Sequence, residues 1–243
     1  MKHRIFVLIL TLSIWQLIHY INTFLIPSPI EVIKAVPELL TNVSVLTDVK
    51  STLVRIIEAF VLSVILAIPF GLILGRFKKV YSAVSYILDF FRSTPATAIF
   101  PLFLILFGVG DAAKTLSAAF ASFLIITFNL AEGIRHINKH KLLAVKIMGA
   151  NHVQTIQKII FWESLPHLFI GLRNGISTAM IVIVVTEMFV GTVSGVGKKI
   201  IDFQITYEIA SMYAMILIVG TIGYLVNKII LTIERRMVHW GSK

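Results

Sequence analysis

The stretch STLVRIIEAFVLSVILAIPFGLILG, residues 51–75, decides the fold class of this chain. Its two charged residues, Arg55 and Glu58, lie near its start, and an apolar run follows. A helix of about 20 mostly apolar residues matches the roughly 30 Å hydrocarbon layer of a bilayer. Backbone amides in lipid need partners within a helix or a closed barrel, and the alternating segments typical of a barrel are absent. We therefore predict an all-α membrane protein.

Composition supports the same class. Of the 243 residues, 57% are hydrophobic and 14% are charged, whereas a soluble domain is about half apolar and a quarter charged. The chain has no cysteine, which excludes disulfides, thiolate metal sites and cysteine nucleophiles. Its seven histidines show no ligand spacing, and no catalytic constellation is evident, so we expect neither enzyme activity nor a cofactor.

Six spans are predicted, and the first is expected to be retained because its apolar run is too long for a signal peptide and lacks a cleavage site. The spans are Ile5–Ile26, Ser51–Gly75, Ser82–Phe107, Ala113–Ile134, Leu168–Val190 and Ile209–Ile233. Residues 1–49 are expected to form the first helix and an extracytoplasmic amphipathic segment. Residues 50–236 are expected to form the membrane-spanning core, which includes a cytoplasmic loop at 135–166, and residues 237–243 a cytoplasmic tail.

The distribution of Lys and Arg predicts the orientation, because these residues resist translocation. With the N-terminus inside, thirteen lie on the cytoplasmic side: Lys2, Arg4, Arg76, Lys78, Lys79, Arg135, Lys139, Lys141, Lys146, Lys158, Arg235, Arg236 and Lys243. Five lie opposite: Lys34, Lys50, Lys114, Lys198 and Lys199. Both termini are thus expected in the cytoplasm of a multi-pass cell-membrane protein. The net charge of +10 is then mainly topological, so we expect no nucleic-acid partner.

The third span carries two prolines, Pro95 and Pro101, which each remove a backbone donor and predict a break near its middle. Freed carbonyls at membrane depth are tolerated against protein or a water-filled cavity. The break is therefore either a packing kink or a wall of a translocation pathway. Under the second interpretation, Asp89, Thr94, Pro95 and Ala98 line the pathway.

Ionisable residues inside spans are costly and often functional. Arg55 with Glu58, and Asp89 with Arg92, are three residues apart, a spacing that permits ion pairing. Many of these side chains could equally reach the interface. Glu187 is predicted to lie deep in the fifth span with no charged neighbour in sequence, so it needs a partner from another helix, and we predict that it also lines the pathway.

Proline and glycine mark further boundaries. Ile26-Pro27-Ser28-Pro29 ends the first helix, and Glu31–Leu40 is predicted to be a short amphipathic helix on the outer surface. The glycine-rich residues 191–197 predict a flexible turn after the fifth span.

The one long cytoplasmic segment, residues 135–166, shows apolar residues at helical spacing on both sides of Gly149. This pattern predicts two short amphipathic helices that meet at a glycine turn. Such a pair could rest on the membrane surface or dock into a groove on a soluble partner.

The sequence AVKIMGA, residues 144–150, followed by Ile159, resembles the cytoplasmic EAA loop of bacterial ABC import permeases. It keeps that pattern at Ala144, Gly149 and Ile159. It departs from it at Leu143, Val145 and Phe161-Trp162, which stand for Glu, Ala and Leu-Pro.

Four further segments resemble the nitrate/sulfonate/taurine class of these permeases, in order and over nearly the whole chain. They are PSP at 27–29, RSTP through FGVG at 92–110, ESLP through GLRNG at 163–175, and VTEM through GVG at 185–197.

This resemblance implies the six-helix type I ABC importer transmembrane domain. It also implies a homodimer of permease copies, or a pair of closely similar permeases. Two ATPase subunits that bind the ATP and an extracytoplasmic solute-binding protein are the further implied partners. Ala144, Gly149, Ala150, Ile156 and Ile159 would then contact the ATPase. Relatives carry nitrate, sulfonates, taurine or vitamin precursors. Two rivals are an ion-coupled secondary transporter that uses Glu187 and a membrane-embedded enzyme.

Overall fold

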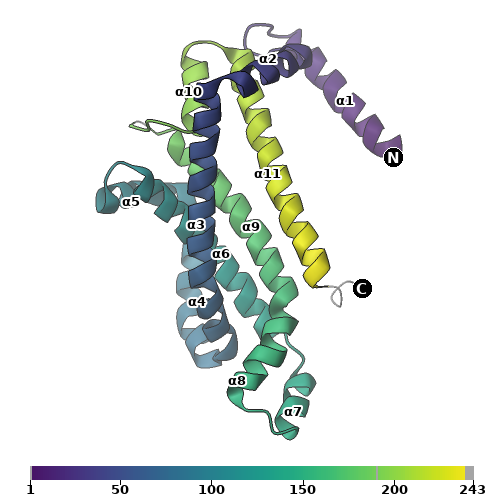
Figure 1. Cartoon of the computed structure of the whole chain (residues 1–243), viewed down its shortest axis with the longest axis vertical. Helices are drawn as coiled ribbons and strands as arrows, with labels where there is room; N and C mark the ends of the chain where they lie inside the picture. The colour runs from purple at the N-terminus through teal and green to yellow at the C-terminus, as the bar shows by residue number, and fades with distance from the viewer. Residues whose placement is uncertain (1, 190, 239–243) are drawn as a thin grey trace. The chain divides into compact units, whose positions relative to one another are not determined.

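The computed structural model describes residues 2–189 and 191–238, and regular structure in this part of the chain is entirely helical (Figure 1). Contacts divide the chain into two compact units, which are described separately. Unit 1 comprises Met1–Leu53 and Glu187–Ile222, and unit 2 comprises Val54–Thr186 and Gly223–Lys243. The predicted three-part division of the chain stays a prediction, and residues 239–243 of the predicted tail lie outside the described residues.

Unit 1 holds two complete N-terminal helices, the beginning of a long one, and a later pair. These elements are α1 Lys2–His19, α2 Pro29–Thr41, the start of α3 Val43–Arg76, α10 Val196–Ile205 and the first part of α11 Ile209–Met237. The helix α10 replaces part of the loop expected between the last two spans. Its N-cap residue, Gly195, has φ of +130°, a conformation that favours glycine.

The first helix is shorter than predicted. It ends at His19 rather than Ile26, because the chain after it folds back onto the helix end. The Trp15 indole Nε1 donates to the Pro27 carbonyl at 3.1 Å, and a ring nitrogen of His19 lies 2.6 Å from the Ile26 carbonyl oxygen. These contacts satisfy backbone acceptors that a continuing helix would otherwise have used.

The predicted amphipathic helix after Pro29 is present as α2, and its start is defined by a capping box. The Ser28 hydroxyl accepts from the Glu31 backbone N–H at 3.2 Å, and the Glu31 carboxylate accepts from the Ser28 N–H at 2.7 Å. The second of these hydrogen bonds lowers the pKa of Glu31, because it stabilises the ionised carboxylate.

Unit 2 contains the remaining elements. They are the rest of α3, α4 Lys78–Ser93, η1 Ala96–Ile99, α5 Phe100–Phe107, α6 Asp111–Arg135, α7 Lys139–Ile147, α8 His152–Thr155, η2 Ile156–Ile160, α9 Phe161–Glu187 and the end of α11. The buried face of α6 is rich in alanine, serine and glycine, which lets neighbouring helices approach closely. The buried hydroxyl of Ser63 on α3 donates to that of Ser122 on α6 at 3.2 Å.

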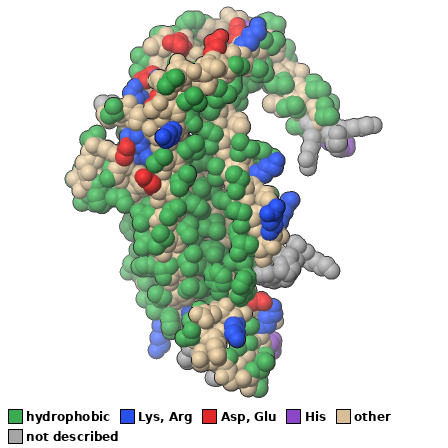
Figure 2. All heavy atoms as spheres, viewed as in Figure 1, with side chains coloured by type: hydrophobic (Ala, Val, Ile, Leu, Met, Phe, Trp, Pro, Cys, Tyr) green, Lys and Arg blue, Asp and Glu red, His purple; other side chains and the backbone are tan. Residues whose placement is uncertain are grey.

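Four helices are long and apolar enough to cross a membrane: α3, α6, the continuous helix Val153–Glu187, and α11. The pair α4 and η1–α5 passes the same test as one broken span, and the apolar part of α1, Ile5–His19, is shorter. The space-filling view shows an almost continuous field of apolar side chains over the long helices on the face that it draws (Figure 2). Such a surface suits lipid or another protein far better than water.

The break predicted in the third span is confirmed. Helix α4 ends at Ser93, and the helical pair that follows is bent from it by 95° (Figure 1). Pro95 lies at the break, and Pro101 lies in the first turn of α5, where its missing N–H costs no hydrogen bond.

Helix α9 begins within the segment 135–166 that was predicted to be a cytoplasmic loop, and before the predicted start of the fifth span. That span was expected from Leu168 to Val190, whereas α9 begins at Phe161 and ends at Glu187, and Val190 lies outside the described residues. Pro166 was expected to mark the boundary but lies inside α9. Burial of Leu165 and Phe169 in one core cluster favours a continuous helix here.

Candidate functional site

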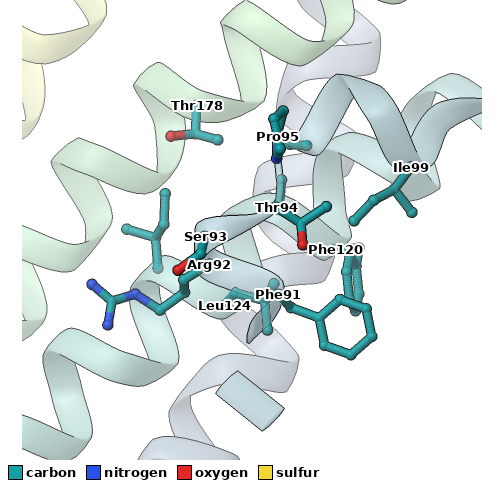
Figure 3. Close-up of a pocket in the computed structure, with 12 residues that line it drawn as sticks. Phe91, Arg92, Ser93, Thr94, Pro95, Ile99, Phe120, Leu124 and Thr178 are labelled. Carbon is teal, nitrogen blue, oxygen red and sulfur yellow. The ribbon is translucent and has the colours of Figure 1, made fainter. Parts of the chain in front are cut away.

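The break between α4 and α5 opens onto a cavity of about 400 Å³ within unit 2 (Figure 3). The end of α4 and the start of η1 form one side, and residues of α6 and α9 form the other. Its lining residues are Phe91, Arg92, Ser93, Thr94, Pro95, Ala96, Ile99, Phe120, Ala121, Leu124, Ile125 and Thr178. An irregular backbone segment thus borders a cavity, as expected where helices break at membrane depth.

A second cavity of about 480 Å³ adjoins the first and is more polar in its residues. It is lined by Arg92, Ile125, Phe128, Asn129, Asn174, Ser177 and Thr178. Arg92, Ile125 and Thr178 line both cavities, so together these side chains form the connection between them. Figure 3 shows Thr178 on its α9 turn facing the segment that contains Thr94 and Pro95.

Of the described residues that line either cavity, Arg92 is the one that carries a charge. Its guanidinium carbon lies 3.5 Å from the centroid of the Phe128 ring, and Nη1 lies 3.4 Å from Asp89 Oδ1. The predicted Asp89–Arg92 pair is therefore present. The Asp89 side chain is 63% exposed, however, so this pair contributes little stability.

The residues predicted to line the pathway do not all line the first cavity. Thr94 and Pro95 line the first cavity, beside Arg92, whereas Asp89 and Ala98 are exposed outside its lining. Glu187 belongs to unit 1 and ends α9 instead of lying deep within it. The role of these residues in transport stays a prediction.

Glu187 was predicted to have a partner on another helix, and this partner is present. Its side chain is fully buried, and Thr52 on α3 lies within hydrogen-bonding distance of both carboxylate oxygens, at 2.9 and 2.8 Å. The backbone N–H of Gly197, in the first turn of α10, also donates to Glu187, at 3.1 Å. A carboxylate at a helix N-terminus is favoured by the helix dipole.

Asp48 extends this polar cluster of unit 1. Its carboxylate accepts from the Gly195 N–H at 2.7 Å and lies 3.8 Å from Lys199 Nζ. The Thr52 hydroxyl in turn accepts from the Val196 N–H at 2.9 Å. The start of α10 is therefore held to α3 by the Asp48 carboxylate and the Thr52 hydroxyl, and to the end of α9 by the Glu187 carboxylate. These contacts explain why residues 195–197 form a defined helix start.

The interpretation of Arg55 and Glu58 as a pair is wrong. Arg55 is buried and pairs with Asp111 at the start of α6, with Nε and Nη2 each 2.9 Å from Oδ1. Glu58 lies on the exposed side of α3. The buried guanidinium forms its ion pair with a residue 56 positions away in sequence. The spacing of charges within one helix cannot indicate such a contact.

The segment 135–166, which is predicted to be cytoplasmic, forms the predicted first helix and glycine turn. Helix α7 ends before Gly149, whose φ of +78° lies in the left-handed region. The second predicted helix is not separate, because α8 continues through the π-helical η2 into α9. Helices α7 and α8 lie at one end of unit 2 (Figure 1).

Apolar residues of this segment divide into two groups. Leu142, Ile156 and Ile160 pack into the core of unit 2. A second group is exposed to at least half of its area: Leu143, Ile147, Met148 and Val153. Of the residues predicted to contact an ATPase, Ala144 and Gly149 are exposed, and Ala150, Ile156 and Ile159 are half-buried.

Sequence reasoning missed several residues of the cavities and of the polar cluster. Asn174 and Thr178 were overlooked, as were Asp48 and Thr52, although each pair has a spacing of four residues that places it on one helix face. Polar pairs at this spacing on an otherwise apolar helix are a usable signal. Arg92 was noted only for its pair with Asp89.

Three comparisons place these features among known proteins. Residues 67–239 match the model of the family described as "Binding-protein-dependent transport system inner membrane component". A probable ABC transporter permease protein of Brucella abortus is 26% identical over 229 residues, which cover 94% of this chain and 91% of the relative. A putative aliphatic sulfonates transport permease protein of Bacillus subtilis is 25% identical over 234 residues, 95% of this chain and 84% of that one.

The fold is also shared with a solved transporter. An inward-facing structure of the MetNI methionine ABC transporter matches with a TM-score of 0.70 and 20% identity, over 79% of this chain and 95% of that chain.

Proposed function

We propose that this chain carries a small sulfonate-bearing solute into the cell. The chain belongs to the family of binding-protein-dependent transport system inner membrane components. Membership makes the chain a permease subunit of an ABC importer, which is a transport component and not an enzyme. Its partners are an ATPase and a solute-binding protein. The ion-coupled secondary transporter is not favoured.

The observation that carries the pathway proposal is the cavity at the broken span. Two adjoining spaces meet at Arg92 and Thr178, between α4, α6 and α9. Helices α6 and α9 are long and apolar enough to cross a membrane, and α4 forms one broken span together with η1 and α5. Burial of polar side chains inside such a bundle costs more free energy than apolar packing would. Polar residues around a cavity at this place therefore indicate a function. The sulfonate class is taken from the relative of Bacillus subtilis, which is named for aliphatic sulfonates.

We further infer that two copies of the chain form the membrane part, as a homodimer in contact with lipid. Helix α5 supports this proposal, because Leu102, Ile105, Leu106 and Phe107 are all at least half exposed. Faces of this kind are covered by lipid or by a second transmembrane subunit. The chain itself is expected to bind no cofactor, and ATP is bound by the ATPase.

The exposed apolar residues around Gly149 are the proposed ATPase-docking surface, which comprises Leu143, Ile147, Met148 and Val153. A helix with an exposed apolar face suits a groove on a partner protein. Closure of an ATPase dimer would move this surface, and α9 would transmit the movement because α8 and η2 join it without a break in helical structure.

Uptake of a sulfonate tests the function directly. With its ATPase and binding protein in proteoliposomes, the chain is expected to support uptake of labelled ethanesulfonate that depends on ATP. Unlabelled taurine or methanesulfonate should compete, because the sulfonate group is shared. ATP-driven uptake of other solutes without competition by sulfonates would refute the substrate class, and a complex with ADP serves as the control.

The orientation of the termini is a separate prediction. Reporter fusions at Lys243 and within residues 193–206 are expected to report opposite sides of the membrane, with Lys243 in the cytoplasm. The thirteen-to-five asymmetry of Lys and Arg is the physical reason. Reports from the same side would contradict both the orientation and the even number of spans.

A further inference from the structure

We propose that Arg92 binds the anionic group of the transported solute, which makes it the specificity-determining residue of the permease. This inference rests on the proposed function and adds the residue and the chemistry of recognition. It concerns the junction of the two cavities, where Arg92, Ile125 and Thr178 line both spaces.

The charge of the cavities supports an anion. Among the described residues, the two linings together contain one cation and no Asp or Glu. Asp89, the acid that approaches Arg92, touches it at 3.4 Å from the exposed side and lies outside both linings. The Arg92 side chain is 35% exposed, so water screens part of its charge, but an anion in either cavity meets this cation and no carboxylate among the described lining residues.

The guanidinium of Arg92 is placed to bind a ligand rather than to serve only in an ion pair within the protein. One face of the guanidinium lies against Phe128, with 3.5 Å between its carbon and the ring centroid. This contact orients the group by cation–π attraction while its edge keeps the N–H donors. A guanidinium carries five such donors, and within the described residues the carboxylate of Asp89 accepts from one nitrogen.

Oxyanions are the ligands that fit this donor arrangement. The planar fork of an arginine matches two oxygens of a carboxylate or phosphate, and a sulfonate presents oxygens in a comparable arrangement. Asn174 and Thr178 add an amide and a hydroxyl on one face of α9. Phe91 and Phe120 provide an apolar wall in the first cavity for an alkyl group. The combined site would hold a small organic anion by its charged end.

The naturally cysteine-free chain allows a direct test with charged thiol reagents. Thr178→Cys places a single thiol at the junction in the complete complex with its ATPase, in nanodiscs. The thiolate attacks the sulfenyl sulfur of a methanethiosulfonate, which forms a mixed disulfide and releases methanesulfinate. The two probes are the 2-sulfonatoethyl reagent, itself an aliphatic sulfonate, and the cationic 2-trimethylammonioethyl reagent.

The measured quantity is the ratio of the modification rates, anionic over cationic. We expect Arg92→Gln to lower this ratio about tenfold, because it removes the local positive potential. Arg92→Lys should retain most of the ratio. The matched control is Arg76→Gln, which removes the same charge from an exposed arginine outside both cavities and should leave the ratio unchanged. Ethanesulfonate should slow the modification of the thiol by both reagents when Arg92 is present. In Arg92→Gln it should no longer slow either reaction.

Several results would overturn the site. An unchanged ratio in Arg92→Gln is one, and an equal change in Arg76→Gln is another. Ser93→Cys, in the first cavity, replaces Thr178→Cys if the latter does not assemble, and failure of both assembled thiols to react also refutes the proposal. ATP-dependent uptake, measured separately, distinguishes the two claims. Uptake with an unchanged ratio overturns the Arg92 site alone, whereas the expected ratio without sulfonate uptake overturns the proposed substrate alone.

Discussion

Gly149→Val is expected to lower ATP-driven transport by more than tenfold while membrane insertion stays normal. Gly149 has φ of +78°, and no atom lies within 4 Å of the position that a Cβ would occupy. The effect is therefore conformational and not a clash. A left-handed residue with a side chain costs about 1–2 kcal/mol, and more when the side chain is β-branched. Valine should shift the turn and thereby misplace the docking surface.

The measurements for this variant are co-purification with the ATPase and uptake in vesicles, with ATP hydrolysis recorded in parallel. The matched control is Gly149→Asn, because asparagine adopts left-handed conformations far more readily than valine. We expect the asparagine variant to bind the ATPase and transport nearly as the parent does. If the valine variant binds and transports like the parent, residues 141–161 are not the element that couples the permease to the ATPase.

Gly133→Ala is expected to destabilise unit 2 by about 2–3 kcal/mol, the upper range for overpacking of a core. A Cβ at position 133 of α6 would lie 2.4 Å from Cβ and 2.7 Å from Cγ of His167 on α9. The Cβ of His167 is tied to the backbone, so the helices themselves must separate. In a helix, alanine otherwise has the better propensity by about 1 kcal/mol, which makes a loss of stability informative.

The measurement is thermal unfolding of the purified complex in detergent, where a fall of roughly 5–10 °C is expected. Gly220→Ala is the matched control, since it also adds one methyl group within a long helix, and nothing lies within 4 Å of the added atom. It should leave the midpoint unchanged or raise it slightly. Equal midpoints for the two variants would contradict the close approach of α6 and α9.

The amino-acid sequence by itself determined the features that arise within one short stretch of chain. Apolar runs of sufficient length predicted the spans, and the proline at position 95 predicted the break, because a missing donor acts within one helical turn. The glycine turn at position 149 was recognised for the same reason, since its conformational freedom belongs to that residue.

Tertiary structure alone decided which helix faces which. The sequence allowed Arg55 to pair with Glu58, yet the partner is Asp111, and Glu187 needed a partner that proved to be Thr52 and the start of α10. The cavities likewise form where α4, α6 and α9 converge, which brings Arg92 beside Thr178. Periodicity shows that a helix has a polar side but not what packs against it. The reason is physical: a hydrogen bond or ion pair depends on distance in space, and residues far apart in sequence meet only after the helices have packed.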